Sequence, residues 1–198
     1  LLTGVVALAH QADKSLQPRI LEAIERLDFG TLGEPLQLDM LRALSLVFIR
    51  MGEPDAATAS RFVAKLDRYF PAKGDLLNRE LANMLVYVKS PTIAAKAIAL
   101  MKQGPKRSAS AVSELLARNP GYGGTIAQML ANQPDAQNIH YAFALRNLKE
   151  SWTPEERKFY FRWLHDAHKW SGGASYQGFI TNIDKDAFEN ASEAERLV

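Results

Sequence analysis

Four basic side chains recur at helical spacing in the stretch EERKFYFRWLHDAHK. They are separated by four, three and four residues: Lys158, Arg162, His165 and Lys169. On an α-helix this spacing places all four on one face, with the neighbouring aromatic residues directed elsewhere. A cationic face of this kind can dock an acidic protein surface or a neighbouring domain. A solvated helix face without a partner has the same pattern, so both interpretations stay open.

A shorter basic stripe occurs earlier in the chain. It comprises Arg61, Lys65 and Arg68, on the second helix of an expected helix pair. If the two helices are equivalent in the fold, the two stripes line one surface. We therefore predict a partner-binding role for seven residues: Arg61, Lys65, Arg68, Lys158, Arg162, His165 and Lys169.

The histidines do not make a convincing metal site. His165 and His168 lie three residues apart, a spacing that can supply two ligands from one helix. Zinc needs further ligands, and the sequence contains no HExxH motif to provide them. The absence of cysteine excludes zinc-thiolate sites, disulfides and c-type haem attachment within this chain. We predict neither a metal nor a cofactor here.

Catalytic motifs are similarly weak. The carboxylates at 155–156 and 184–186 fall where helix first turns or solvent faces favour acidic residues, without the burial that separates the pKa values of a catalytic pair. There is no GxSxG motif. The stretch NPGYGG at 119–124 lacks the Gly-Lys-Ser/Thr ending of a phosphate loop, so we expect a turn between helices. An active site between irregular helices in 103–135 remains an alternative to a non-catalytic chain.

The glycine-rich stretch KWSGGASYQGF, at 169–179, is expected to join two helices. Gly172 and Gly173 would make the turn, with Ser175 close to the start of the next helix. Its free N–H groups could hold an anion, as at any helix start. We expect three aromatic side chains to pack this turn against the preceding helices: Trp170, Tyr176 and Phe179. Gly178 is expected to allow two helices to approach closely.

Along most of the chain, apolar residues recur at the spacing of an α-helix, so the residues discussed above are expected to lie on helices or in the turns between them. Leu77, Leu81 and Leu85, for example, share one face, and alternating strand patterns are nearly absent. We predict helices at 2–11, 15–27, 36–51, 55–69, 76–89, 91–102, 109–118, 123–132, 136–150, 154–169 and 174–189.

Capping residues support these boundaries. Ser90 and Thr153 each precede a proline at a first helical position. Thr153 and Ser192 are each followed three residues later by glutamate, the pattern of a capping box. Three glycines are expected to stop a preceding helix: Gly52, Gly74 and Gly104.

The spacing of turns indicates a repeat. Asp13, Pro54, Pro91 and Pro134 follow one another at steps of about 40 residues, as in HEAT and armadillo arrays. The fold class is therefore all-α: a solenoid of about ten to eleven helices in one domain, 1–198, irregular toward the C-terminus. Regular helix pairs are expected at 1–102, an irregular pair at 103–135 and C-terminal helices at 136–198.

Composition limits the possible partners. The 198 residues include 24 basic and 22 acidic side chains, a net charge of +2, whereas nucleic-acid-binding domains usually have a clear basic excess. No apolar run is long enough to span a membrane. Because the sequence begins inside an amphipathic pattern, without an initiator Met or signal peptide, we expect a fragment of a longer protein.

Five stretches together resemble the HEAT-repeat region of large multidomain proteins of planctomycetes and related bacteria: LRALSLVFIRMGEP, LNRELANMLVYVKSP, LLARNPGYGGTIAQML, IHYAFALRNLKESWTPEERKFYFRWL and SGGASYQGFITNI. The resemblance covers nearly the whole chain. In that family the region connects a membrane-bound-dehydrogenase-type propeller to a c-type cytochrome domain with a CxxCH motif. It implies an extracytoplasmic, periplasmic role in oxidation or electron transfer, with haem in an adjacent domain. The family's redox residues have no matching positions here.

The leading hypothesis is thus a non-catalytic scaffold that spaces or docks protein domains. The alternative is a nucleic-acid-binding HEAT protein of the alkylpurine DNA glycosylase type, which uses a basic concave surface with aromatic residues. The sequence leaves the oligomeric state open.

Overall fold

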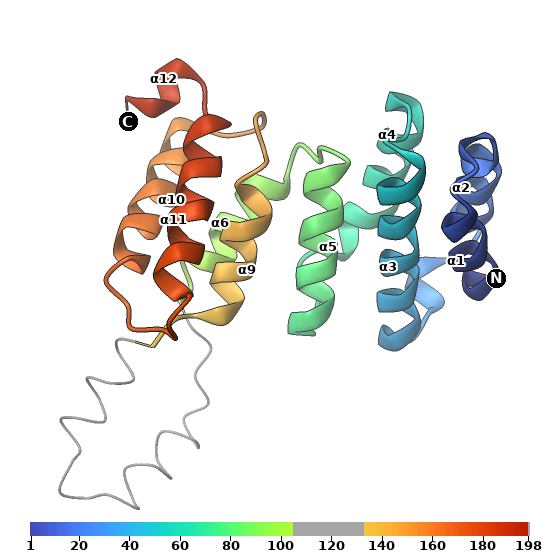
Figure 1. The fold of residues 1–198 in the computed structure, drawn as a ribbon, viewed down its shortest axis with the longest axis horizontal. Helices are drawn as coiled ribbons and strands as arrows, with labels where there is room; N and C mark the ends of the chain where they lie inside the picture. The colour runs from blue at the N-terminus through green and yellow to red at the C-terminus, as the bar shows by residue number, and fades with distance from the viewer. Residues whose placement is uncertain (105–132, 198) are drawn as a thin grey trace, which may run out of the picture. The chain divides into compact units, whose positions relative to one another are not determined.

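The computed structural model describes residues 1–104 and 133–197, and these two ranges are helical without a strand. Within each of the two compact units, 1–96 and 97–198, neighbouring helices pack in the manner of a helical solenoid, which confirms the predicted fold class (Figure 1). The expected helices at 109–118 and 123–132, the NPGYGG turn and most of the proposed 103–135 active site lie outside the described residues. Within the described ranges, no helix has both the length and the apolar character needed to cross a bilayer.

The chain forms two compact units, residues 1–96 and 97–198. The first unit contains five complete α-helices: α1 (Leu2–Gln11), α2 (Gln17–Glu25), α3 (Glu34–Met51), α4 (Ala56–Leu66) and α5 (Asp75–Tyr87). Three short 3-10 helices join them: η1 (Lys14–Leu16), η2 (Phe29–Thr31) and η3 (Asp67–Tyr69). The boundary between the units falls within α6 (Ile93–Met101).

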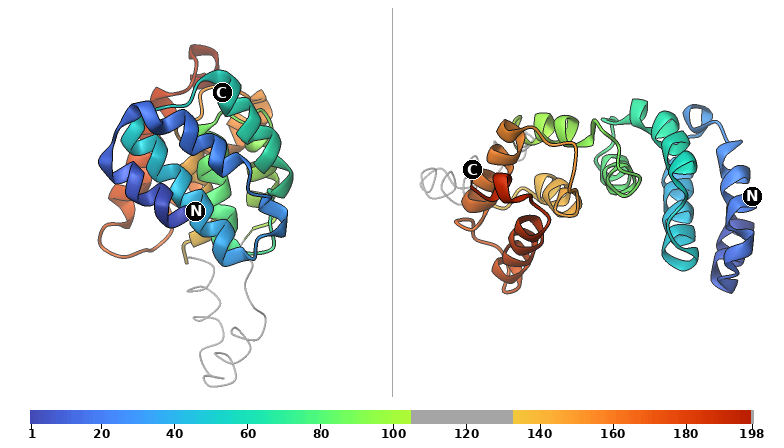
Figure 2. Two further views of the ribbon diagram at one scale, coloured as in Figure 1. Left: turned by 90° about the vertical axis from the view of Figure 1, so that its right-hand side faces the viewer. Right: turned by 90° about the horizontal axis from the view of Figure 1, so that it is seen from above.

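Helix α3 is the centre of the first unit. It contacts both α1 and α5, as Figures 1 and 2 show. Phe48 of α3 stacks on Tyr87 at a centroid distance of 5.0 Å and meets the edge of Phe62 at 6.2 Å. One apolar side chain thereby joins α3 to α4 and α5. The apolar faces of these helices are buried against one another, as in repeat proteins, where each unit is stabilised by its neighbours.

The second unit contains α9 (Ala136–Leu145), α10 (Pro154–Ala167), α11 (Tyr176–Glu189) and the short α12 (Glu193–Arg196). Helix α11 contacts α9 and α10, and α12 contacts α10. The fully buried Tyr160 of α10 donates a hydrogen bond of 2.7 Å to the carbonyl oxygen of Ala142 in α9. This bond satisfies the one polar atom that the aromatic ring carries into the core.

Local capping chemistry starts α10 and α12 as predicted. Thr153 and Glu156 form a reciprocal capping box, and Ser192 and Glu195 form another. The capping-box pattern thus marked the short helix α12, although the periodicity alone had not predicted a helix there.

Several predicted boundaries need correction. The helix expected at 136–150 ends at Leu145. Beyond it, carbonyl oxygens accept from side chains and not from helical N–H groups: that of Arg146 from Asn190 Nδ2 at 3.1 Å, and that of Leu148 from Trp152 Nε1 at 2.9 Å. Gly52 and Gly104 have positive φ and follow helices as expected, but Gly74 has φ −85° and is the N-cap residue of α5. It begins a helix instead of stopping one.

The 169–179 stretch does join two helices, α10 and α11. Trp170 packs edge-on against Trp163, and the Tyr176 hydroxyl donates to the Ala167 carbonyl oxygen at 2.9 Å. Ser175 is the N-cap residue, although its side chain makes no capping bond. The role expected of Gly178 is wrong: no atom would lie within 4 Å of a Cβ added there, so no close helix approach requires a glycine.

Candidate partner-binding face

Helix α10 separates a buried side from a cationic side. Tyr160, Trp163 and Leu164 are buried, whereas Lys158, Arg162 and His165 are exposed. Because the buried and exposed positions each recur at steps of three and four residues, they occupy different faces of the helix. We call the exposed Lys158, Arg162, His165 and Lys169 the α10 basic face. Lys169 lies in the turn just after the helix ends at Ala167.

An internal carboxylate neutralises one end of this face. Asp166 Oδ1 lies 2.7 Å from Lys169 Nζ. The hydrogen bond from Lys169 lowers the pKa of Asp166 more than burial raises it, with further lowering by the charges of Lys169, His165 and Arg162. Within the part of the chain that the structure describes, Lys158 and Arg162 have no ion-pair partner. Within the α10 basic face, these two side chains are therefore the Lys and Arg cations available to a partner.

The earlier stripe on α4 is mostly engaged inside its own unit. Arg61 Nε makes an ion pair of 2.7 Å with Glu25 Oε1. Lys65 Nζ donates to the carbonyl oxygen of Glu25 at 2.8 Å and to that of Leu27. These two cations fasten α4 to the end of α2, where carbonyl groups at a helix C-terminus attract positive charge.

Arg68, just after α4, is placed differently. It donates a hydrogen bond of 3.0 Å to the Tyr69 hydroxyl and is exposed. With Glu34 and Lys73 it lines a cavity of about 370 Å³ whose apolar wall includes Phe29. Of the three residues in this stripe, Arg61 and Lys65 thus bind the end of α2, whereas Arg68 lines a cavity.

The two stripes lie in different compact units, so each is a surface of its own unit.

The two neighbouring histidines are placed differently. His168 Nε2 lies 3.6 Å from Asp184 Oδ2, and His165 is exposed on the α10 basic face. Among the residues that the structure describes, no three His, Cys, Asp or Glu side chains gather as they would around a metal ion.

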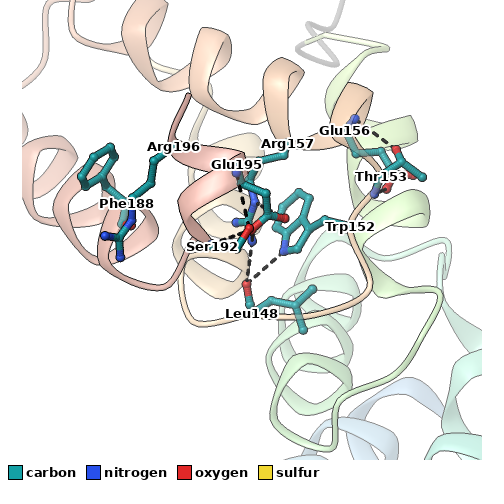
Figure 3. A network of polar contacts seen from close by, with 9 residues as sticks. All are labelled: Leu148, Trp152, Thr153, Glu156, Arg157, Phe188, Ser192, Glu195 and Arg196. Carbon is teal, nitrogen blue, oxygen red and sulfur yellow. Dashed lines mark hydrogen bonds and ion pairs between the residues drawn. The ribbon is translucent and has the colours of Figure 1, made fainter. Parts of the chain in front are cut away.

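Arg157 is a buried cation that our sequence analysis missed. Its exposed fraction is 0%. Nη2 donates to the Leu148 carbonyl oxygen at 3.3 Å, and the guanidinium lies 4.1 Å from the centre of the Trp152 ring (Figure 3). The spacing of Arg157 with Tyr160 and Leu164 places it on the buried face of α10, a signal that was present in the sequence.

Glu195 of α12 supplies the opposite charge. Arg157 Nε lies 3.2 Å from Glu195 Oε1, and Nη2 lies 3.4 Å from Oε2. Burial lowers the pKa of Arg157 more than Glu195 raises it. Burial raises the pKa of Glu195, but hydrogen bonds from Ser192 and Arg157 outweigh it and lower that pKa overall. The pair attaches α12 to α10 and is internal, with Glu195 also completing its capping box (Figure 3).

Asp67 is a second feature that the sequence analysis missed. Its Oδ1 accepts hydrogen bonds from Ser90 Oγ at 2.7 Å and Thr92 Oγ1 at 2.6 Å, and its Oδ2 lies 2.6 Å from Lys96 Nζ. Ser90 was expected to cap a helix that begins at Pro91. Its Oγ does accept from the Thr92 N–H at 3.3 Å, but α6 begins only at Ile93, so Pro91 is not a first helical residue. The cluster joins the end of α4 to the start of α6.

No protein-family model, curated protein or solved structure matches the chain. The geometry described above is therefore the basis for proposing a function.

Proposed function

We propose that this chain is a non-catalytic, HEAT-like helical scaffold that docks an acidic surface of a partner protein or neighbouring domain on the α10 basic face. The observation that carries the proposal is the exposure of Lys158 and Arg162 without an ion-pair partner among the described residues. Three other basic side chains have a carboxylate partner within their own unit: Arg157 of α10, Lys169 just after α10 and Arg61 of α4.

The anchoring of α10 in its unit also supports this role. Its capping box fixes the first turn, and its opposite face is held in the core by Tyr160 and Leu164. Charged side chains on a rigid element lose less conformational freedom on binding than charges on a loop. The family resemblance of the sequence makes a redox domain of a longer exported protein the first partner to consider.

Charge reversal tests the proposal. The variant Lys158→Glu/Arg162→Glu should weaken binding of a fluorescent polyglutamate peptide at low salt by about tenfold or more, since both cations would become repulsive. Fluorescence anisotropy measures this change. The matched control is Lys149→Glu/Lys185→Glu, which changes the net charge equally at two exposed positions of the same unit. Equal weakening by the two variants, or no binding by the unmodified chain, would overturn the proposal.

A DNA duplex is the second probe, because phosphates also seek exposed Lys and Arg side chains. The scaffold proposal expects the peptide to bind more tightly than the duplex at equal salt. Tighter DNA binding with a steep salt dependence, lost in Lys158→Glu/Arg162→Glu, would favour the nucleic-acid alternative instead.

A further inference from the structure

A small cavity in the second unit is walled by aromatic rings and a carboxylate. Its volume is about 240 Å³. Phe159 and Trp163 of α10 line it, together with Trp170 from the turn after α10 and Asp135, the N-cap residue of α9. Trp163 and Trp170 meet nearly at right angles, with ring centroids 5.4 Å apart. The cavity therefore offers both π-electron surfaces and a negative charge.

Asp135 has one oxygen to spare. Its Oδ1 accepts the backbone N–H groups of Gln137 at 3.1 Å and Asn138 at 3.2 Å, which caps α9. Its Oδ2 is buried and has no hydrogen-bond partner in the described part of the chain. A buried carboxylate oxygen without a partner is costly, and a positively charged group beside it would recover much of that cost.

Lys102 shows that a cation is accommodated at this wall. Its Nζ lies 5.2 Å from the centre of the Phe159 ring, within the range of a cation–π interaction. Lys102 also lines the cavity, but among the described residues no ion pair joins it to Asp135. The aromatic wall thus has an internal cation while the carboxylate oxygen stays unpaired.

We propose that this cavity binds a small alkylammonium ion, with its positive charge between the Asp135 carboxylate and the rings of Phe159, Trp163 and Trp170. Aromatic cages recognise quaternary ammonium groups because such groups are weakly hydrated and present their charge over a broad surface. A divalent metal ion fits poorly, since Ca²⁺ and Mg²⁺ require several oxygen ligands and Asp135 offers one free oxygen. The binding activity is separate from docking at the α10 basic face.

Choline titration tests the site. The background is Trp152→Phe, which leaves Trp163 and Trp170 as the only two tryptophans and keeps a ring beside Arg157. Choline should change the tryptophan fluorescence saturably, whereas 3,3-dimethylbutan-1-ol, its uncharged analogue of similar shape, should not. Equal responses to the two compounds would show that charge plays no part and would overturn the proposal.

Two variants test whether the charges of Asp135 and Lys102 affect the affinity for choline. Asp135→Asn keeps a good N-cap but removes the charge, and should weaken choline binding by about fivefold or more. Lys102→Gln removes the competing internal cation and should strengthen binding. Asp55→Asn is the matched control, because Asp55 is the N-cap of α4 in the other unit, and it should leave binding unchanged. Absence of saturable choline binding, or equal affinity in Asp135→Asn, would sink the inference.

Discussion

At the scale of single residues, Asp67 gathers two hydroxyl donors and one ammonium on its carboxylate. Burial raises the pKa of Asp67, but the hydrogen bonds from Lys96, Thr92 and Ser90 outweigh this and lower the pKa below its ordinary value of 3.8. The carboxyl group therefore stays ionised in the folded chain at neutral pH and stabilises the junction of α4 with α6.

The variant Asp67→Asn should lower the free energy of unfolding by about 1–3 kcal/mol at pH 7, because hydrogen bonds to a charged group are lost. An amide NH₂ would also face the ammonium of Lys96, donor against donor. Urea denaturation measures the change. Asp28→Asn is the control: Asp28 caps η2 by accepting the Gly30 N–H at 3.0 Å, and asparagine is as good an N-cap as aspartate, so little change is expected. Equal stability of Asp67→Asn and the unmodified chain would contradict this account.

At the scale of elements, the ion pair between the buried Arg157 and the partly buried Glu195 helps to attach α12 to α10. Removing one member of such a pair leaves a buried charge uncompensated, whereas replacing both can be nearly neutral. Glu195→Gln should thus destabilise the fold by about 2 kcal/mol even though glutamine can still complete the capping box. In Arg157→Met/Glu195→Gln, most of that loss should be recovered.

A matched control exists in α10 itself. Glu156→Gln changes the corresponding residue of the other capping box, where Glu156 accepts from the Thr153 N–H at 2.9 Å and faces no buried arginine. Its effect on the free energy of unfolding should be small. Hydrogen exchange of α12 amides should speed up in Glu195→Gln alone. If Glu156→Gln and Glu195→Gln cost the same, the ion pair contributes nothing beyond the cap.

At the scale of the whole molecule, several carboxyl groups give stability the same pH dependence. The pKa values of Asp67, Asp166 and Glu195 are all lowered in the folded chain. A group with a lower pKa when folded contributes stability above its unfolded pKa, and this contribution is lost as the pH falls through the folded pKa. The free energy of unfolding should therefore be nearly constant from about pH 7 to 5 and decline below about pH 4.

Urea denaturation at pH 7, 5, 4 and 3 checks this expectation. Asp67→Asn should show a shallower decline than the unmodified chain, because one of the contributing groups no longer titrates. A free energy of unfolding that rises as the pH falls from 5 to 3 would contradict the expected pH dependence.

Local sequence patterns predicted the longer helices of the described residues and both capping boxes. The reason is that a helix depends on contacts three and four residues apart, and a capping box likewise joins residues three apart. The bounds of α1 and the end of α3 agree with the prediction to the residue. The predicted end of α9 was wrong: the helix stops at Leu145, and the carbonyl oxygen of Arg146 accepts from Asn190, 44 residues away, which is a tertiary contact.

Which charged side chains have an ion-pair partner depends on the packing of the folded chain. Lys96 meets Asp67 across 29 positions of sequence, and Arg157 meets Glu195 across 38. Sequence spacing placed Arg61 and Lys158 on similar cationic stripes, and both side chains are exposed, but packing gave Arg61 a carboxylate partner while Lys158 has none among the described residues. The physical reason is that helical periodicity assigns a side chain to a face, whereas its partner and its access to solvent depend on the helices that pack against that face.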